Sequence, residues 1–245
     1  MSMNASLSRV RVVLVRPSHP GNIGAAARAM KTMGLTRLYL VSPARFPDRE
    51  ADARASNAAD VLAGATTCAN LHEALSGTVL QLAFTARNRA LSHTALPVHD
   101  AVAQVARVSS AQETALVFGN ETYGLSNEEV MCCNRVAYIP ADPEFSSLNL
   151  AAAVQIAAYE LRLAVLEAPP GPTQVNELAS HEETERFFVH LEQSIYASGF
   201  LQPDNPRRLM ERMRRLFGRS GLEKEEINIW RGMLAAWDLL AKNRK

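Results

Sequence analysis

The sequence has few cysteines and no long apolar run, and both absences narrow the kinds of protein it can encode. The three cysteines, Cys68, Cys132 and Cys133, are an odd number with one adjacent pair and no CxxC spacing. Such a set does not form a disulfide framework or a common zinc site, and it indicates a reducing compartment. No stretch reaches the roughly 18 apolar residues of a membrane span, and no signal peptide is recognisable. We therefore expect a cytoplasmic protein with no metal site and no membrane partner.

The chain also has little net charge and lacks the common nucleotide-binding motifs. Its 26 Lys and Arg nearly balance 25 Asp and Glu, which excludes a uniformly basic nucleic-acid coat but allows a local basic patch. Because 47% of its 245 residues are hydrophobic, the chain can bury a core and is not disordered. It contains neither GxGxxG nor a P-loop lysine, which argues against a Rossmann enzyme without removing that alternative.

The first 168 residues alternate short β-rich runs with helical patterns. Strands are expected at residues 10–15, 37–41, 78–85, 114–118 and 135–139. Helices are expected at 22–33, 49–63, 100–108, from Ser126 onward and at 148–166. This alternation predicts an α/β fold, a mostly parallel sheet with helices on both faces. In such sheets ligands bind beyond the carboxyl ends of the strands.

A proline-rich segment then separates two regions of different composition. Three prolines and a glycine stand within residues 169–172, where neither a helix nor a central strand can continue. We expect an α/β domain at 1–168, a linker at 169–175 and a small all-helical domain at 176–245.

Charge is segregated within the expected helical domain. Residues 177–192 hold five glutamates and one arginine, whereas residues 207–219 hold six arginines and one glutamate. Four of these arginines recur at helical spacing: Arg208, Arg212, Arg215 and Arg219. The stripe is either a solvated helix face or a set of phosphate contacts, since guanidinium groups bind phosphate in bidentate fashion.

The last helix carries its own apolar pattern. Ile227, Trp230, Leu234 and Trp237 recur at helical spacing. We expect both tryptophans to face the core, because stacking on a nucleobase is the less common role.

Two loops that follow expected strands carry residues suited to chemistry. After the first strand, Gly21 and Gly24 allow close backbone approach, Asn22 is placed to cap the next helix, and Arg28 follows in its second turn. After strand 114–118, a loop that begins at Gly119 contains Glu121. Each pattern taken alone is equally consistent with an ordinary turn.

A third loop precedes the long helix at 148–166. Ser146 or Ser147 is placed to cap this helix. Asn149 stands in an otherwise apolar helical start, where its amide is costly unless it is paired.

Taken together and in this order, the three loops resemble the motifs of a known enzyme family. Asn22-x-Gly24-x-x-x-Arg28, Gly119-x-Glu121-x-x-Gly124-Leu125 and Ser147-Leu148-Asn149 resemble the SPOUT methyltransferases of the TrmH branch, over residues 8–165. The first and third motifs and the helical tail are also similar to the TrmJ family within that branch. The resemblance implies methyl transfer from S-adenosylmethionine to the ribose 2′-hydroxyl of the pyrimidine nucleotide at position 32 of the tRNA anticodon loop. It also implies a homodimer and a trefoil knot at the C-terminal end of the α/β domain.

The resemblance also assigns roles by position. The residues expected to bind the cofactor are Thr85, Ala86, Arg87, Gly119, Ile139, Ser146, Ser147 and Leu148. The residues expected to take part in catalysis are Arg28, which activates the hydroxyl, and Asn22, Glu121 and Asn149, which order the site. Relatives often carry arginine where this chain has Asn120, so we assign no required role to that position.

The expected partner is tRNA, bound in part by Arg208, Arg212 and Arg215, with no DNA partner. Two further possibilities stay open. One is a SPOUT enzyme that modifies another RNA site, and the other is an RNA-binding module without catalysis.

Overall fold

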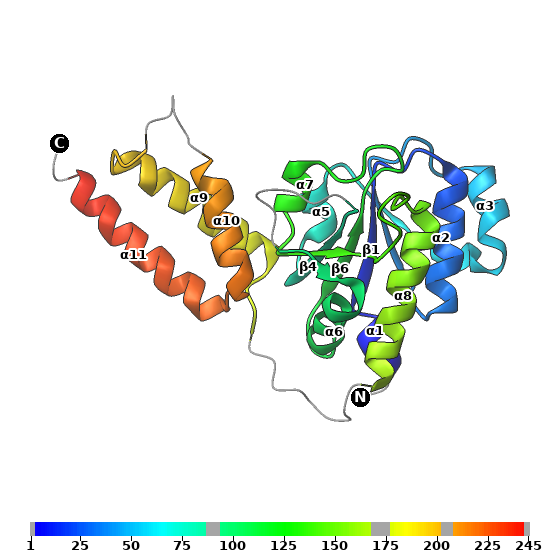
Figure 1. Cartoon of the computed structure of the whole chain (residues 1–245). Helices are drawn as coiled ribbons and strands as arrows, with labels where there is room; N and C mark the ends of the chain where they lie inside the picture. The colour runs from blue at the N-terminus through cyan, green and yellow to red at the C-terminus, as the bar shows by residue number, and fades with distance from the viewer. Residues whose placement is uncertain (1–2, 87–93, 168–176, 202–207, 243–245) are drawn as a thin grey trace.

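The computed structural model describes residues 3–86, 94–167, 177–201 and 208–242 (Figure 1). Its strands are β1 Val10–Val15, β2 Arg37–Val41, β3 Thr66–Cys68, β4 Leu80–Phe84, β5 Leu96–Pro97, β6 Thr114–Phe118 and β7 Arg135–Tyr138. The helices of its N-terminal part are α1 Met3–Leu7, α2 Pro20–Thr32, α3 Arg49–Ala55, α4 Ala59–Ala63, α5 Leu71–Leu75, α6 Val98–Ser109, α7 Asn127–Met131 and α8 Leu150–Glu167. The C-terminal part contains α9 His181–Ala197, α10 Leu209–Ser220 and α11 Lys224–Lys242.

The strands form one parallel sheet, as the alternation of elements predicts. Their order is β3-β2-β1-β6-β4-β7-β5, and every pairing between named strands is parallel. The chain builds one half of the sheet outward from β1 and then crosses to build the other half. The carboxyl ends of β4, β6 and β7 therefore lie side by side, on the side of the sheet that the chain reaches after this reversal.

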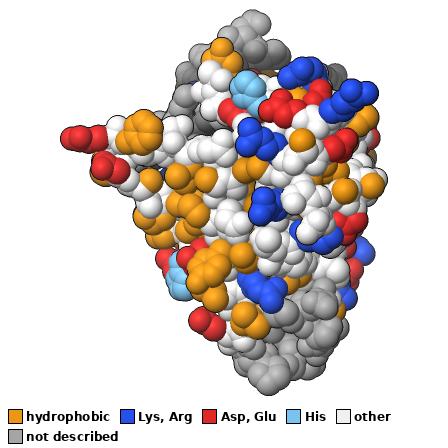
Figure 2. Space-filling model, turned by 90° about the vertical axis from the view of Figure 1, so that its right-hand side faces the viewer, with side chains coloured by type: hydrophobic (Ala, Val, Ile, Leu, Met, Phe, Trp, Pro, Cys, Tyr) orange, Lys and Arg blue, Asp and Glu red, His pale blue; other side chains and the backbone are white. Residues whose placement is uncertain are grey.

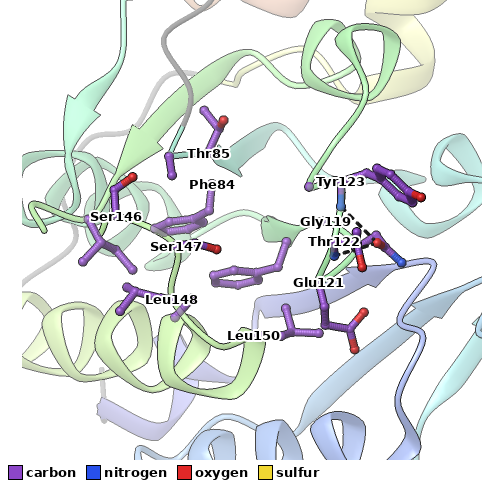
Figure 3. A pocket seen from close by; sticks show the side chains of 16 residues that line it. Phe84, Thr85, Gly119, Glu121, Thr122, Tyr123, Ser146, Ser147, Leu148 and Leu150 are labelled. Atoms are coloured by element: carbon purple, nitrogen blue, oxygen red, sulfur yellow. Dashed lines mark hydrogen bonds between the residues drawn. The ribbon is translucent and has the colours of Figure 1, made fainter. Parts of the chain in front are cut away.

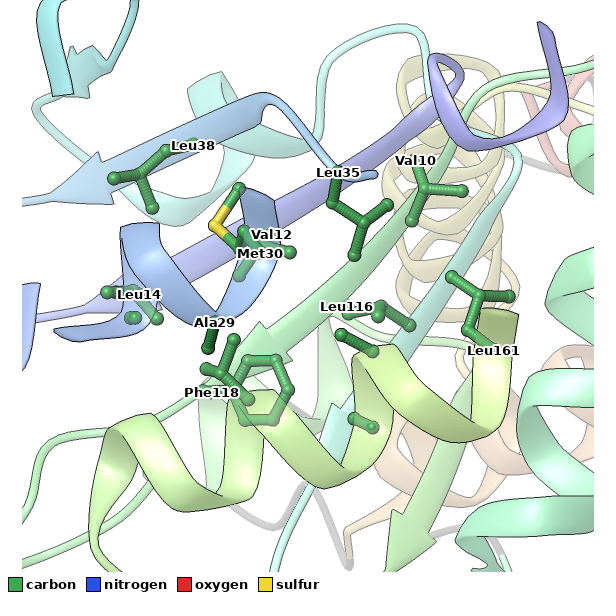
Figure 4. Close-up of a cluster of buried hydrophobic side chains, with 14 of the residues drawn as sticks. Val10, Val12, Leu14, Ala29, Met30, Leu35, Leu38, Leu116, Phe118 and Leu161 are labelled. Atoms are coloured by element: carbon green, nitrogen blue, oxygen red, sulfur yellow. The ribbon is translucent and has the colours of Figure 1, made fainter. Parts of the chain in front are cut away.

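Alternate residues of each central strand enter two different cores. Val10, Val12 and Leu14 of β1 pack on the face covered by α2, α6 and α8, and this core includes Leu116, Phe118 and Leu161 (Figure 4). Val13 and Val15 point to the opposite face, toward α5 and α7. This two-residue period of buried side chains is what a sheet covered on both faces requires.

The contact between α2 and α3 depends on a glycine. A Cβ atom on Gly24 would lie only 2.0 Å from the backbone oxygen of Ala51. Ala51 and Ala55 are fully buried on this side of α3, so the two helices meet almost backbone to backbone.

Several expected elements differ from the observed ones. The helix expected at 49–63 is broken, because Ser56 has a φ of +52° and a 3₁₀ turn over Ser56–Ala58 separates α3 from α4. Helix α2 begins at Pro20, whose fixed φ suits the first helical position, so Asn22 lies inside the helix and does not cap it. The sequence analysis missed α1, β3, α5 and β5, each of five residues or fewer and thus without a readable period.

The C-terminal helices form a separate small core. Phe187 is fully buried and meets Phe217 and Trp230, and the rings of Phe217 and Trp230 pack edge to face. Trp230 is therefore a core residue, as expected. Trp237 is not, since 49% of it is exposed. Helix α11 packs mainly on α9, and its other side faces away from the rest of the molecule (Figure 1).

The C-terminal helices attach to the amino ends of two strands. The backbone N–H of His181 donates to the oxygen of Thr78 just before β4 (2.8 Å). The guanidinium of Arg135, at the start of β7, donates to the backbone oxygens of Gly218 and Arg219 at the end of α10. The carboxylate of Glu182 accepts from the N–H of Gly77 (2.9 Å). The expected linker lies outside the described residues, so its boundaries remain a prediction.

No helix among the described residues is long and apolar enough to cross a membrane. The parallel sheet and the helical C-terminal part agree with the expected fold class, while the trefoil knot remains a prediction.

We predict that Gly24→Ala destabilises the protein by about 1–3 kcal/mol, because α2 and α3 must separate to admit the new methyl group. Gly232→Ala is the matched control, since a Cβ atom there meets nothing within 4 Å and replaces a helical glycine. The control should be neutral or stabilising by up to about 1 kcal/mol. Urea unfolding of both variants measures the difference, and equal midpoints would contradict the close contact.

Candidate functional site

Three side chains from the three predicted motifs form a continuous hydrogen-bonded chain. The carboxylate of Glu121 accepts from Asn22 Nδ2 at 2.9 Å, and Asn22 Oδ1 accepts from Asn149 Nδ2 at 3.0 Å. Asn149 Oδ1 in turn accepts from the N–H groups of Ala151 and Ala152 at the start of α8. The loops after β1, β6 and β7 are thus held together at the carboxyl edge of the sheet. We call these three residues the polar chain.

Glu121 also fixes the loop between β1 and α2. Its carboxylate accepts from the backbone N–H and hydroxyl of Ser18, both at 2.8 Å, and from the N–H of His19 at 3.2 Å. Partial burial by itself would raise the pKa of this carboxyl group. The hydrogen bonds from Asn22 and Ser18 favour the charged form more strongly and lower its pKa to about 2.

Asn149, and not a serine, caps the long helix. The sequence analysis placed the cap at Ser146 or Ser147, and the helix at Leu148. The structure starts α8 at Leu150, with the Asn149 side chain on the first free N–H groups. The same amide donates to Asn22. The amide is therefore paired, but the residue is exposed, so burial in an apolar segment does not require the pairing.

A pocket lies at the carboxyl ends of β4, β6 and β7 (Figure 3). Ser146, Ser147 and Leu148 line one side, and Gly119, Glu121, Thr122 and Tyr123 line the other. Phe84 and Phe118 form an apolar wall, with stacked rings whose centroids are 4.5 Å apart. This composition, apolar rings beside backbone and hydroxyl groups, suits a ligand with an aromatic base and a polar tail.

The structure brings together nearly all the residues expected to bind the cofactor. The pocket is lined by Thr85, Ala86, Gly119, Ile139, Ser146, Ser147 and Leu148. Arg87 lies outside the described residues. Of the residues expected in catalysis, Glu121 lines the pocket, and Asn22 and Asn149 reach it through the polar chain.

Arg28 is the exception among the expected catalytic residues. It lies two turns beyond Asn22 on the exposed side of α2, and it does not line the pocket. Within the described part of the chain its guanidinium group has no hydrogen bond or ion pair. It is thus available to a ligand that reaches this surface from outside.

Asn120 has a structural function that the sequence analysis did not assign. Its Nδ2 donates to the backbone oxygen of Arg16 at 2.8 Å, and its Oδ1 accepts from the N–H groups of Thr122 and Tyr123. The side chain therefore shapes the turn that lines the pocket and ties it to the end of β1. Phe84, Phe118 and Tyr123 were also missed. Their only signal in the sequence is their place at the ends of strands or inside the second motif.

At Gly119 the loop after β6 approaches its own backbone closely. A Cβ atom there would lie 2.2 Å from the backbone of Gly124 and Leu125. Only glycine lets the loop fold back on itself, as its bridge between Asn120 and Gly124 shows.

The arginines of α10 differ in their surroundings. Arg208 precedes the helix in a left-handed conformation and pairs with Glu211 at the surface. Arg212 is exposed, and Arg215 is half-buried. Arg214 is structural, since it binds Glu185 of α9 through two hydrogen bonds and lies 4.4 Å from the Phe188 ring centre. The expected stripe is therefore only partly available for phosphate groups.

Comparison with known proteins gives two family matches and a set of similar chains. Residues 9–159 match the SpoU rRNA Methylase family, and residues 182–245 match the C-terminal domain of the tRNA methyltransferase TrmJ. The chain is 47% identical to the tRNA (cytidine/uridine/adenosine-2′-O-)-methyltransferase TrmJ of Pseudomonas aeruginosa, with 96% of each covered. It is 46% identical to a tRNA (cytidine/uridine-2′-O-)-methyltransferase TrmJ of Yersinia pestis, covering 94% of this chain and 91% of the relative.

Solved structures agree with these matches. TrmJ from Z. mobilis superposes with a TM-score of 0.80 at 31% identity, covering 92% of this chain and 97% of that one. The SpoU methyltransferase AviRb of Streptomyces viridochromogenes, solved with AdoMet, gives a TM-score of 0.51 at 25% identity over 64% and 61% of the two chains. A structure concerned with 2′-hydroxyl methylation of C/U34 on tRNA gives 0.53 at 25% identity, over 65% of this chain and 97% of that one.

We predict that Glu121→Gln lowers the unfolding free energy at pH 7 by about 1–3 kcal/mol, because an amide nitrogen would replace one acceptor among several donors. The carboxylate stabilises the folded state above its unfolded pKa of about 4.5, and this contribution is lost as the pH falls toward about 2. The gap between wild type and variant should therefore narrow between pH 4.5 and pH 2. Urea titrations across this range measure it, with Glu144→Gln in the exposed β7–α8 loop as the control. A gap that does not change with pH would contradict the role of the charge.

Proposed function

Because the chain belongs to the SpoU rRNA Methylase family and ends in a TrmJ C-terminal domain, we propose that it methylates position 32 of the tRNA anticodon loop. It is a tRNA (cytidine/uridine-2′-O)-methyltransferase that uses S-adenosylmethionine. The proposal adds the nucleotide position, the roles of individual residues, a homodimer and a cytoplasmic location.

The residues that line the pocket support the proposed cofactor site. Seven residues chosen from three separate loops line it together, although they are spread over more than 60 positions of the chain. The donor set fits the cofactor: the Phe84 and Phe118 rings with Leu148 suit an adenine ring. The hydroxyls of Thr85, Ser146 and Ser147, with backbone groups of the Gly119 loop, suit its ribose and amino-acid groups.

When bound there, S-adenosylmethionine supplies a methyl group on a positive sulfur atom, which needs little activation because its leaving group is neutral. The task of the protein is then to place the ribose hydroxyl in line with that methyl group at about 3 Å. Glu121, Asn22 and Asn149 act by fixing the three loops that shape this space.

Arg28 is proposed to handle the substrate. A guanidinium group, which gives up its proton only with great difficulty, is a poor general base. It is well suited to hold the phosphate 3′ to the target nucleotide and to stabilise the charge that develops on the attacking oxygen. The proton then passes to the phosphate or to water.

The position of Arg28 outside the pocket supports a homodimer. In a dimer the exposed side of α2 in one protomer can serve the pocket of its partner. Helix α8, which packs on α2, and the loop before it offer exposed apolar side chains for such a contact, since Phe145, Tyr159 and Leu166 are 81%, 49% and 57% exposed. Figure 2 shows hydrophobic side chains interspersed with Lys and Arg on the face where α2, α3 and α8 lie.

The first experiment is transfer of labelled methyl groups from S-adenosylmethionine to tRNA, followed by mapping of the modified nucleotide. The proposal expects a 2′-O-methylpyrimidine at position 32. Label at position 34 would contradict it and align the chain with the C/U34 enzyme, in which about a third of this chain has no counterpart. Binding of tRNA without any transfer would instead indicate a non-catalytic RNA-binding module.

We predict that Arg28→Ala lowers kcat about 100-fold or more while the Kd for S-adenosylmethionine changes less than about threefold, because the residue acts on the RNA. Single-turnover kinetics and calorimetry separate the two effects. Arg49→Ala, an exposed arginine on the adjacent α3, is the control. Retained turnover, or a matching loss of cofactor binding, would refute this role.

We also predict that joint replacement of Arg208, Arg212 and Arg215 by Gln weakens tRNA binding and flattens its dependence on salt. Each lost phosphate contact should reduce the slope of log K against log salt by about 1. Arg208 should contribute least, because Glu211 already neutralises it. Arg186→Gln on α9 is the control, and an unchanged slope in the triple variant would assign the stripe to solvent.

A further inference from the structure

A second cavity lies at the amino edge of the sheet, between the α/β part and the C-terminal helices. It measures about 210 Å³, against about 150 Å³ for the pocket that fits S-adenosylmethionine. Both parts of the chain line it: Leu80 and Arg135 at the starts of β4 and β7, Arg107 on α6, and Phe217 and Leu222 at the end of α10 and just after it. No described residue lines both cavities, so the proposed methyl transfer leaves this one without a role.

The charged side chains that line this cavity are all positive. Arg107 and Arg135 are among its residues, and no aspartate or glutamate is found in the described part of its lining. Arg107 lies one turn after Gln104 on α6, and Gln104 Oε1 accepts from Arg135 Nε at 3.1 Å. The two arginines therefore approach the cavity from neighbouring elements. Because like charges repel where water is scarce, a negative group between them would be stabilised.

Arg135 is held by neutral groups alone. It donates to Gln104, to the backbone oxygen of Asn134 at 2.9 Å, and to the backbone oxygens of Gly218 and Arg219. The carbonyl groups at the end of α10 carry only partial negative charge. Burial lowers the pKa of the guanidinium group, and no carboxylate of the described residues opposes this shift. A partly buried arginine is ordinarily paired with a full negative charge, and here that charge is missing.

Donors on both sides of the cavity remain available to a ligand. Arg135 Nη2 makes only a long hydrogen bond, 3.4 Å to the oxygen of Arg219. Arg107 is exposed, and Thr184 lines the cavity from α9. Neither of these two side chains has a hydrogen bond or ion pair within the described ranges. The apolar side chains of the lining, such as Leu222, complete a site with a cationic part and an apolar part.

We propose that this cavity binds a small organic anion, a monophosphate or a carboxylate on an apolar body. Guanidinium groups hold the oxygens of either head group in bidentate fashion, and the apolar body packs against Phe217 and Leu222. An RNA strand is a poorer occupant, because its phosphates could reach the exposed Arg107 but not the partly buried Arg135.

The bound anion would join the two parts of the chain. Arg107 and Arg135 belong to the α/β part, whereas Thr184, Phe217 and Leu222 belong to the C-terminal part. A ligand that binds only when these parts are together stabilises their contact. The site shares no lining residue with the pocket at the carboxyl edge, so the proposal does not rest on the proposed function.

The first test is a calorimetric titration of the full chain with phenyl phosphate. Excess S-adenosylmethionine is present so that the probe cannot occupy the other pocket. One molecule should bind per chain, and phenol, the same ring without the charge, should bind at least about tenfold more weakly. Benzoate replaces phenyl phosphate in a second titration, and the tighter anion identifies the head group. Binding of neither anion, or equal binding of phenol, would overturn the proposal.

The second test replaces one arginine of the cavity. Arg107→Gln should weaken binding of the tighter anion by about tenfold, and it should keep the fold because Arg107 is exposed. Arg54→Gln removes an exposed arginine of α3 and should change nothing. The anion should also raise the urea midpoint of the wild type and of Arg54→Gln more than that of Arg107→Gln.

Unchanged anion affinity in Arg107→Gln would contradict the proposal. If that variant also bound tRNA more weakly, Arg107 would be an RNA contact instead. Methyl transfer by the wild-type chain reports on the proposed function independently of both tests.

Discussion

The polar chain of Glu121, Asn22 and Asn149 is the constraint on which the site depends. Strands of a parallel sheet end together, but nothing in the sheet fixes the loops beyond them. Here one carboxylate and two amides link three such loops and also supply the cap of α8. The residues differ by up to 127 positions in sequence, so their geometry exists only after the sheet has formed. The pocket is therefore a product of the whole α/β fold rather than of any one motif.

The fold could be predicted largely from the sequence because its strands are short apolar runs and its helices are long enough to show a period. The helix expected from Ser126 onward is an example, since Ser126 caps α7 and forms a capping box with Glu129. The three-residue β3 and the break at Ser56 carry no comparable signal. The cap of α8 was expected at Ser146 or Ser147, but Asn149 caps the helix and also donates to the distant Asn22, a contact that local preference could not identify.

The site shows the same division between local and distant information. Residues such as Gly119 and Ser147 could be placed at the pocket because they stand at fixed positions in the motifs. The function of Asn120 could not be predicted, since one of its partners, the backbone oxygen of Arg16, lies 104 positions earlier in the chain. Likewise, the spacing of the arginines in the sequence does not show that Arg214 is a structural residue and Arg212 an exposed one. Only the position of Glu185 on a neighbouring helix turns one into a structural contact and leaves the other exposed.

Strands β4 and β7 connect the C-terminal helices to the pocket. Their amino ends bind the C-terminal helices through Thr78 and Arg135, and their carboxyl ends line the pocket through Phe84 and Ile139. The five residues of β4 thus set a spacer of about 16 Å. One inserted residue would rotate every following side chain to the opposite face and shift both attachments at once. Variation in chain length among such enzymes is therefore expected in the connecting loops, while these two strands keep their length.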